Sequence, residues 1–472
     1  MNAGLRQVLG NFGKLLSGKA AGGVLSLFYL MIVTRALGAA GFGTLSLVHG
    51  YVTFIGGVVA FSGFHGVVHY GAEALARGEH GRLLRLIRLS SLVEAACGLA
   101  AIGLAAALVP LVGPHLHWSP AAMSMAVPYS LAVLATVRAT PQGILQLANR
   151  FDLIGWHQTV MPVARLIGTL VAWGCGAGLR GFLVVWLVSA LAEGAAMWLM
   201  ALAVLRGMRL RGGLRAGLRG GLAGIGVENP GLARFMLSAN ANISLRELSP
   251  NLAPLTVGWM MGPAAAGLLA LAQRASNVLQ QPAVLLGQAI FSVLAGHHAE
   301  RDWRELGSTV KRSVWLATLA ALPVLLVLSL FGPSLLHLLG GRGFKHLEGG
   351  VLLLTLLAVA RLIRFASQPL VAALTATGRP GKAMRVSVLA ELALYPLLPL
   401  LLWRCGVVGA GWQALMQASL SFWLWRRSFR RWLRRRAVEE AIASPAASDA
   451  ALPEAAQADA VAGPPLRRVA TI

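Results

Sequence analysis

Six arginines stand inside segments that are otherwise long and apolar, and their chemistry can be argued first. They are Arg138, Arg165, Arg246, Arg274, Arg361 and Arg364. A charge in such a segment is costly, so it usually faces a cavity or a partner. Arg361 and Arg364 are three residues apart, which places them on one helical face. Because the rigid fork of guanidinium donors suits phosphate, the set predicts a water-filled cationic cavity that binds an anionic ligand.

Four glutamates in or beside other apolar segments support a competing interpretation. They are Glu94, Glu193, Glu247 and Glu391. Each could neutralise an arginine and lock two helices together, which would leave that arginine without a binding role. A proton- or cation-coupled carrier also relies on acidic residues in its spans, and Glu193 and Glu391 are the candidates for ion coupling. We favour the cationic cavity, and both alternatives stay open.

No convincing metal or cofactor pattern accompanies these charges. His65, His69 and Glu73 recur at four-residue spacing and could resemble a metal or proton site, although such a row more often simply reaches the membrane interface. The three cysteines lie far apart in the sequence. Motifs for a phosphate-binding loop, a zinc protease and a nucleophile elbow are absent from the sequence. We therefore expect no cofactor, no metal and no enzymatic activity.

The segments that carry the arginines have the composition of membrane helices. The chain is 57% hydrophobic and 12% charged, with mean hydropathy +0.69, a balance that soluble domains do not reach. Only helices or closed barrels span lipid, and the short alternating segments of a barrel are absent. We therefore expect an all-α polytopic protein with about twelve transmembrane helices. The predicted spans are 15–36, 42–68, 89–112, 121–148, 153–174, 180–205, 235–260, 264–295, 313–339, 350–376, 384–403 and 406–426.

Basic residues are distributed by membrane side. Roughly thirty of the 41 Lys and Arg fall in loops on the side of the N-terminus, which the positive-inside rule makes cytoplasmic. About five fall in loops on the other side: Arg35, Arg180, Arg342, Lys345 and Arg404. Both termini are thus predicted in the cytoplasm of a bacterial inner-membrane protein. This distribution explains the net charge of +24 without a nucleic-acid partner.

An internal repeat predicts that the membrane part has two lobes. The matching segments are ALGAAGFGTLSL at 36–47 and MMGPAAAGLLAL at 260–271. Their alignment places Gly38 on Gly262 and Gly43 on Gly267, and six intervening spans keep the repeats parallel. If the cationic cavity lies between two lobes of one chain, a monomer would be sufficient to form it.

The repeat and the composition together predict four regions. Residues 1–205 form an N-terminal six-helix lobe, and residues 235–426 form a C-terminal six-helix lobe. Residues 206–234, rich in Gly and Arg, are predicted to be a basic cytoplasmic linker. Residues 427–472 are predicted to be a cytoplasmic tail, first polybasic and then disordered.

Two stretches resemble a known family. FYLMIVTRALGAAGFGTLSLVHGYVTF, from Phe28 to Phe54, is similar to the opening of bacterial Wzx-type polysaccharide flippases, whose first two helices are joined by an RxLGxxxFGxLSL turn. PQGILQLANRFDLIGWHQTVMPVARLIGTLVAW, from Pro141 to Trp173, resembles the fourth and fifth helices of that family. The resemblance implies membership of the multidrug, oligosaccharidyl-lipid and polysaccharide exporter superfamily. It also implies a V-shaped pair of six-helix bundles, alternating access and a glycan on undecaprenyl pyrophosphate, but no specific binding residue.

The expected function is a flippase that moves a lipid-linked anionic oligosaccharide across the inner membrane for surface polysaccharide, lipopolysaccharide or exopolysaccharide synthesis. Its partners would be this substrate, membrane lipids, and the polysaccharide polymerase and glycosyltransferases of the pathway, with no nucleic acid. Two alternatives remain open. One is a cation-coupled small-molecule exporter, and the other is a non-transporting membrane scaffold of a polysaccharide synthesis complex.

Overall fold

The computed structural model is helical, and its described part contains no strand. The residues it describes are 3–59, 61–208, 224–277, 287, 290–291, 293–294, 296–298, 300–341, 344, 349–377, 386, 388–390 and 392–443. A helix satisfies its own backbone hydrogen bonds, which lipid cannot do. The predicted all-α class is confirmed.

The helices of the first half cover the predicted N-terminal lobe. They are α1 (Ala3–Val59), α2 (Phe64–Ala76), α3 (His80–His115), α4 (Pro120–Tyr129), the 3-10 helix η1 (Ser130–Thr136), α5 (Ala139–Leu147), α6 (Phe151–Gly174) and α7 (Leu179–Gly207). α1 is two helices joined at Gly38, where φ is 66°. Such a left-handed turn favours glycine, and it separates the first two predicted spans.

The helices of the second half follow residue 224. They are α9 (Ile225–Glu228), α10 (Leu232–Met261), α11 (Pro263–Ser276), α13 (Trp303–Leu330), α14 (Gly332–Gly340), α15 (Gly350–Ala366), α16 (Gln368–Ala376), α18 (Leu397–Cys405) and α19 (Val408–Ala443). Asp302 begins α13 by accepting a hydrogen bond from the backbone N–H of Glu305 at 2.8 Å. The predicted spans 264–295 and 384–403 lie only partly within the described residues.

Six helical segments of the described part are long and apolar enough to cross a membrane. They are Gly22–Val59, His80–His115, Pro120–Leu147, Leu179–Gly207, Trp303–Leu330 and Gly350–Ala376. Large apolar side chains lie exposed on their surfaces, including Leu99, Val188 and Leu326. Such exposure is expected where lipid is the solvent, and it supports a polytopic membrane protein.

Three spans predicted as continuous helices are interrupted. In the span predicted at 42–68, helix α1 ends at Val59 and helix α2 begins at Phe64. The span at 121–148 passes from α4 through η1 to α5, and the span at 350–376 divides into α15 and α16. Pro128 lies in the last turn of α4, and Pro369 lies in the first turn of α16. A proline lacks a backbone N–H donor, which weakens the regular helix at these points.

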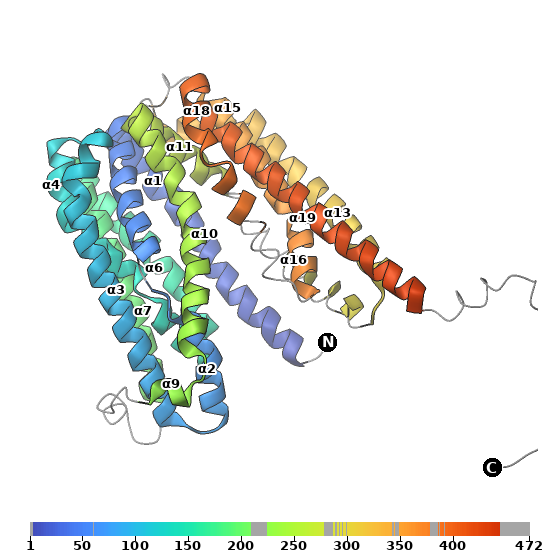
Figure 1. The fold of residues 1–472 in the computed structure, drawn as a ribbon. Coiled ribbons are helices and arrows are strands. Elements are labelled where there is room, and N and C mark those ends of the chain that lie inside the picture. Colours follow the sequence, from blue (N-terminus) through green and yellow to red (C-terminus); the bar gives the residue numbers. More distant parts are fainter. Residues whose placement is uncertain are drawn as a thin grey trace, which may run out of the picture.

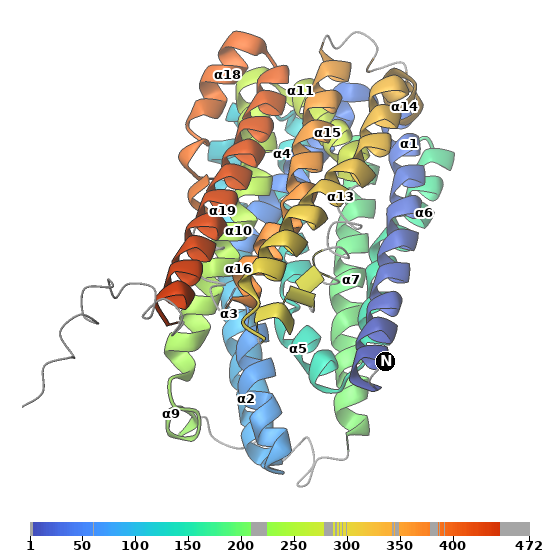
Figure 2. The same cartoon turned by 90° about the vertical axis from the view of Figure 1, so that its right-hand side faces the viewer.

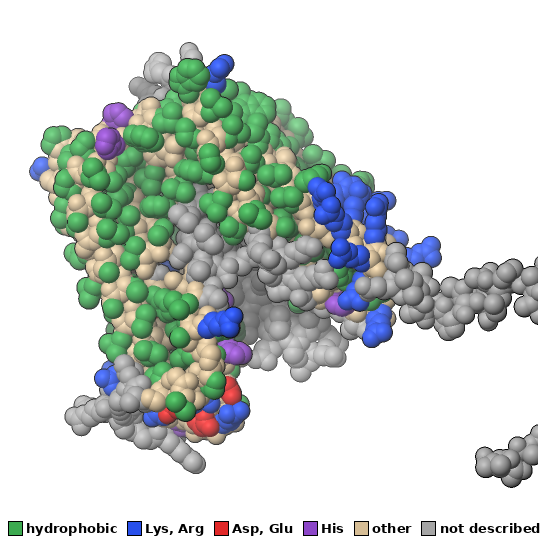
Figure 3. Space-filling model, in the orientation of Figure 1, with side chains coloured by type: hydrophobic (Ala, Val, Ile, Leu, Met, Phe, Trp, Pro, Cys, Tyr) green, Lys and Arg blue, Asp and Glu red, His purple; other side chains and the backbone are tan. Residues whose placement is uncertain are grey.

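The described helices form two arms of a V. One arm holds α2, α3, α4, α6 and α7, and the other holds α13, α15, α16, α18 and α19 (Figure 1). The arms meet near α11 and diverge toward the end where the chain begins, and the view turned by 90° shows the helices running along the same axis (Figure 2). The space-filling view shows the molecule hollowed between the arms (Figure 3). The predicted lobe boundaries themselves stay a prediction.

The two copies of the internal repeat, residues 36–47 and 260–271, contact each other where the arms join. Gly38 (φ 66°, ψ −174°) and Gly262 (φ 83°, ψ 176°) share one backbone conformation. A Cβ on Gly43 would lie 1.7 Å from the carbonyl oxygen of Pro263, and a Cβ on Gly267 would lie 2.8 Å from that of Ala39. Pro263 and Ala39 are themselves aligned by the repeat. The two repeats therefore cross each other with their backbones in direct contact.

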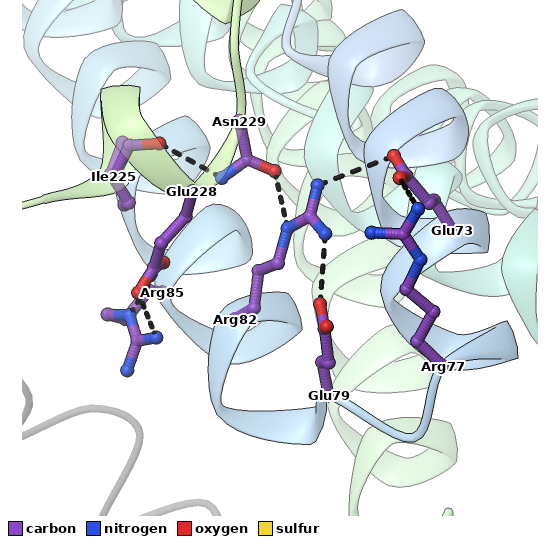
Figure 4. A network of polar contacts seen from close by, with 8 residues as sticks. All are labelled: Glu73, Arg77, Glu79, Arg82, Arg85, Ile225, Glu228 and Asn229. Atoms are coloured by element: carbon purple, nitrogen blue, oxygen red, sulfur yellow. Dashed lines mark hydrogen bonds and ion pairs between the residues drawn. The ribbon is translucent and has the colours of Figure 1, made fainter.

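The predicted linker 206–234 is described only at its ends, since residues 209–223 lie outside the described part. Its C-terminal end is ordered against α3 (Figure 4). Arg85 forms an ion pair with Glu228, and the Nε of Arg82 donates to the side chain of Asn229 at 2.9 Å. Arg82 also pairs with Glu79. This polar network attaches the start of the second half to the first arm.

The predicted polybasic tail begins inside a helix. α19 continues past the predicted end of the last span at 426 and reaches Ala443. The arginines of 427–436 therefore extend the final helix instead of forming a separate segment. Residues 444–472, the part predicted to be disordered, lie outside the described residues.

Candidate functional site

Arg165 of α6 is the largest fully buried side chain of the described core. Its Nε lies 3.3 Å from the Ser189 hydroxyl, its Nη1 3.4 Å from the Tyr29 hydroxyl, and its Nη2 3.4 Å from His49 Nε2. The guanidinium also lies 4.2 Å from the ring centroid of Trp186. No described carboxylate pairs with it. Hydroxyl, imidazole and ring faces thus stabilise a charge that burial would otherwise make very costly.

The arginine determines the proton position on His49. A guanidinium has only donors, so the Nε2 of His49 must accept from Arg165. The proton of the neutral ring is then on Nδ1, which lies 2.9 Å from the Tyr129 hydroxyl and donates to it. Polar contacts therefore run from α6 through α1 to α4. The histidine is held neutral beside a fixed cation.

Arg274 brings a second positive charge to the same place from the other half of the chain. It lies in the last turn of α11 and is exposed, and its charge acts on both Tyr29 and His49. We call the set Arg165, Arg274, Tyr29 and His49 the cationic junction. The structure thus brings together two of the six predicted arginines. Arg165 is sealed between helices in this conformation, whereas Arg274 is accessible.

Arg138 is paired instead of free. It precedes α5, and its Nη1 forms an ion pair with the carboxylate of Glu193 on α7. The backbone carbonyl of Glu193 lies 2.9 Å from His157 Nε2. The Arg138 side chain is 39% exposed, so one face of this pair is accessible. The helix-locking alternative therefore describes Arg138 and Glu193 well, and Glu193 is already engaged within the protein.

Glu94 of α3 has a role that the sequence did not reveal. Its two carboxylate oxygens accept hydrogen bonds from the backbone N–H groups of Ala139 and Thr140, at 2.6 and 2.9 Å. These are the first residues of α5, so the fully buried carboxylate caps a helix that begins inside the protein. A negative charge there also compensates the helix dipole. The sequence signal was a glutamate in one span opposite a Thr-Pro step in the next.

Arg361 and Arg364 lie on one face of α15, as predicted, and both are half-buried. Neither a hydrogen bond nor an ion pair joins Arg361 to another described residue, and it experiences the like charge of Arg364. One turn later, Gln368 donates to the Arg364 carbonyl at 3.3 Å and lies next to Gly287. Two like charges on adjacent turns repel each other, so an anion between them would be stabilising.

Two predicted residues cannot be placed. Arg246 belongs to α10, but its side chain lies outside the described residues, as does the whole of Glu391. Among the described residues no group of three His, Cys, Asp or Glu could hold a metal. Of the row considered for a metal or proton, His69 stacks on Phe235 and Glu73 pairs with Arg77. These contacts are structural.

Sequence reasoning missed the side chains that surround Arg165. Tyr29 and His49 belong to the first and second predicted spans, and Trp186 and Ser189 to the sixth. A histidine alone in an apolar span was the available signal, because a polar ring inside a membrane helix needs a partner. Its partner could not be identified without the packing of α1 against α6 and α7.

Comparison with known proteins places this geometry in context. A family model, MatE, matches residues 247–400. The chain is 28% identical over 345 residues to the inner membrane protein YghQ of Escherichia coli (strain K12), covering 73% of this chain and 94% of that protein. Over residues 247–400 the chain is therefore similar to the MatE family, and over most of its length it is similar to a protein of the inner membrane.

Solved structures share the fold. The inward-facing conformation of a multidrug resistance MATE family transporter of the MOP superfamily superposes with TM-score 0.64 at 14% identity, over 89% of this chain and 96% of that chain. An outward-facing conformation of such a transporter gives 0.56 at 15% identity, over 90% and 96%. A MATE structure in the bent conformation also gives 0.56, at 14% identity over 93% and 100%. The described chain has the MATE fold, with the higher score against the inward-facing form.

Proposed function

We propose that this MatE-type membrane protein is a flippase that moves a lipid-linked, anionic oligosaccharide across the inner membrane by alternating access. The MATE fold occurs in inward-facing and outward-facing forms, which is what alternating access requires. On the positive-inside distribution, both termini are cytoplasmic and the V opens to the cytoplasm. The substrate class we infer is a glycan on undecaprenyl pyrophosphate.

The balance of charge within the spans carries the proposal. Glu94 and Glu193, the described glutamates of these spans, are both engaged by the first half of the chain. Arg274 and Arg361 make neither a hydrogen bond nor an ion pair with a described residue, and Arg364 adds a like charge beside Arg361. The excess is positive. A pyrophosphate presents several oxygens to such a set of guanidinium groups, which bind phosphate through charge-assisted hydrogen bonds.

The shape suits a substrate with a polar head and a lipid tail. Figure 3 shows a hollow between the arms toward the end where they diverge. A head group could enter between the arms while its polyprenyl tail stays in the bilayer. A single chain supplies both arms, so a monomer is sufficient. Glycosyltransferases would supply the substrate and a polymerase would consume it.

A second candidate is a cation-coupled exporter of small molecules. It is favoured by two of the solved structures with this fold, which are of a multidrug resistance transporter. In that function Glu193 or Glu391 would exchange an ion. To bind an ion, the Glu193 carboxylate would first have to separate from Arg138. A Glu193→Gln variant lacks this carboxylate, so it should abolish ion-driven transport if the protein is such an exporter. The scaffold alternative needs neither the glutamates nor the intramembrane arginines.

Binding of the head group tests the proposed substrate class. We expect the purified protein to bind undecaprenyl pyrophosphate oligosaccharide more tightly than the same glycan on an uncharged lipid. The Arg361→Ala/Arg364→Ala variant should bind at least tenfold more weakly, because each charge-assisted hydrogen bond contributes about 1.5–3 kcal/mol. Arg404→Ala, an exposed arginine on the predicted opposite side, is the matched control. Equal binding of charged and uncharged lipid would contradict an anionic substrate.

A further inference from the structure

The last helix carries a row of arginines that the transport function does not use. Trp423, Arg426, Arg427, Arg430, Arg431 and Arg434 line a surface groove of about 450 Å³ along α19. All six side chains are exposed. They recur every three to four residues, so they share one helical face. We call this face the arginine groove, and Figure 3 shows a cluster of basic side chains over this end of the second arm.

The opposite face of the same helix is fixed to the protein. Phe429 and Trp432 are 4% and 2% exposed, and Trp432 packs edge-on against Trp303 at the start of α13, with 5.4 Å between ring centroids. Leu433 contacts Gly307 of α13. The helix therefore cannot turn its arginines inward. The arginine groove is a rigid surface of the folded arm, not a flexible basic tail.

Within the described part of the chain, the charges of the groove are not paired with carboxylates. No described carboxylate forms an ion pair with Arg426, Arg427, Arg430, Arg431 or Arg434, and the sequence of α19 has no acidic residue before Glu439. The guanidinium of Arg427 lies over the Trp423 ring, 4.9 Å from its centroid. Five cations in one groove repel one another, so a bound anion would be strongly stabilising there.

The position of the groove along α19 identifies the source of those anions. Residues 408–425 contain no charged side chain, and about 18 residues at 1.5 Å each span about 27 Å, which matches the hydrocarbon core. The first arginine therefore emerges at the level of the lipid head groups. Trp423 lies about one turn before this arginine and is 51% exposed. Tryptophan is enriched at membrane interfaces, so its position fits the same level.

We propose that the arginine groove is a binding site for the phosphate head groups of anionic phospholipids. Each guanidinium can donate a forked pair of hydrogen bonds to phosphodiester oxygens, and Trp423 packs beside the glycerol and the upper acyl chain. Zwitterionic lipids carry the same phosphate with a compensating cation, so they bind more weakly. The site would fix the end of the second arm to the anionic leaflet. It is independent of which substrate the protein carries.

Native mass spectrometry of the full-length protein in neutral detergent tests the proposal. Phosphatidylglycerol and phosphatidylcholine with identical acyl chains are added in equal amounts, and bound lipids are counted. Wild type should retain phosphatidylglycerol preferentially. The Arg427→Gln/Arg430→Gln/Arg431→Gln/Arg434→Gln variant should lose that preference, with at least a tenfold drop in apparent affinity. Inorganic phosphate at the same concentration should not displace the lipid.

The control removes arginines from the other end of the molecule. The guanidinium of Arg404 lies 4.9 Å from the centroid of the Trp403 ring, just as that of Arg427 lies over the Trp423 ring. Both Arg404 and Arg180 are exposed. The Arg180→Gln/Arg404→Gln variant should keep the preference for phosphatidylglycerol. Wild type that binds both lipids equally would overturn the proposal and assign the groove to solvent or to an acidic protein. Retention of the preference in the four-arginine variant would overturn it as well.

Discussion

At the residue scale, the charges inside the spans are stabilised in different ways. Arg138 pairs with a carboxylate, and Glu94 caps a helix. Arg165 is held by Tyr29, His49 and the Trp186 ring without any described carboxylate. The sequence predicted that intramembrane glutamates could neutralise arginines, and this describes Arg138. It could not predict the surroundings of Arg165, because they come from three predicted spans whose packing no local pattern specifies.

Removal of Arg165 tests whether the cationic junction stabilises the first arm. Arg165→Ala leaves a cavity and removes the donor to Tyr29 and His49, so the free energy of unfolding should fall by about 3 kcal/mol. Arg165→Met fills most of the volume and should cost less, since it leaves no large void. Thermal unfolding of the purified variants in detergent measures both. An Arg165→Ala protein as stable as the exposed-site control Arg180→Ala would argue against this role.

At the element scale, the interruptions of the spans and the crossing of the repeats determine the architecture. Hydropathy predicted which segments of the chain cross the membrane, because the length of an apolar segment can be read directly from the local sequence. The breaks at η1 and Ser367 lie near Pro128 and Pro369, but a proline alone does not determine whether a span stops there or continues as a kinked helix. The continuation of α19 through its arginines was also missed. Its buried face, Phe429 and Trp432, is visible only when the helix is packed against α13.

The crossing of the repeats predicts the effect of a single methyl group. Gly43→Ala places a Cβ 1.7 Å from the Pro263 carbonyl oxygen, so the arms can no longer meet as they do here. We expect this variant to lose the closed contact and to populate conformations in which the joined end is open. Spin-label distances between the arms at that end should lengthen.

The same helix supplies the matched control for this experiment. A Cβ on Gly50 would meet nothing within 4 Å, so Gly50→Ala should leave the distances unchanged. It should not destabilise the helix, because alanine has a higher helix propensity than glycine. Unchanged distances in Gly43→Ala as well would show that the glycine contact does not hold the arms together.

At the scale of the whole molecule, the V of two arms is the central feature, and the positive charge between them is part of the proposed function. The all-α class, the membrane location of the helices and the repeated glycine turns could be predicted from the sequence, because each follows from composition or from a local pattern. The conformation of the molecule, that is, at which end the two arms diverge and how far, could not be predicted from the sequence. Which arginines face the hollow depends on how far the arms are open. Of the six intramembrane arginines predicted from the sequence, Arg274 is the one that the described residues show as exposed in this state.

Translocation in proteoliposomes tests the account most directly. Undecaprenyl pyrophosphate oligosaccharide with a fluorescent label is placed in both leaflets, and its accessibility to an external quencher is followed with wild type, Arg361→Ala/Arg364→Ala and the control Arg404→Ala. We predict rapid flipping by wild type and by the control, and at least a tenfold slower rate in the double variant with folding intact. Absence of flipping by folded wild-type protein, or an equal rate in the double variant, would contradict a flippase that works through this pair of arginines.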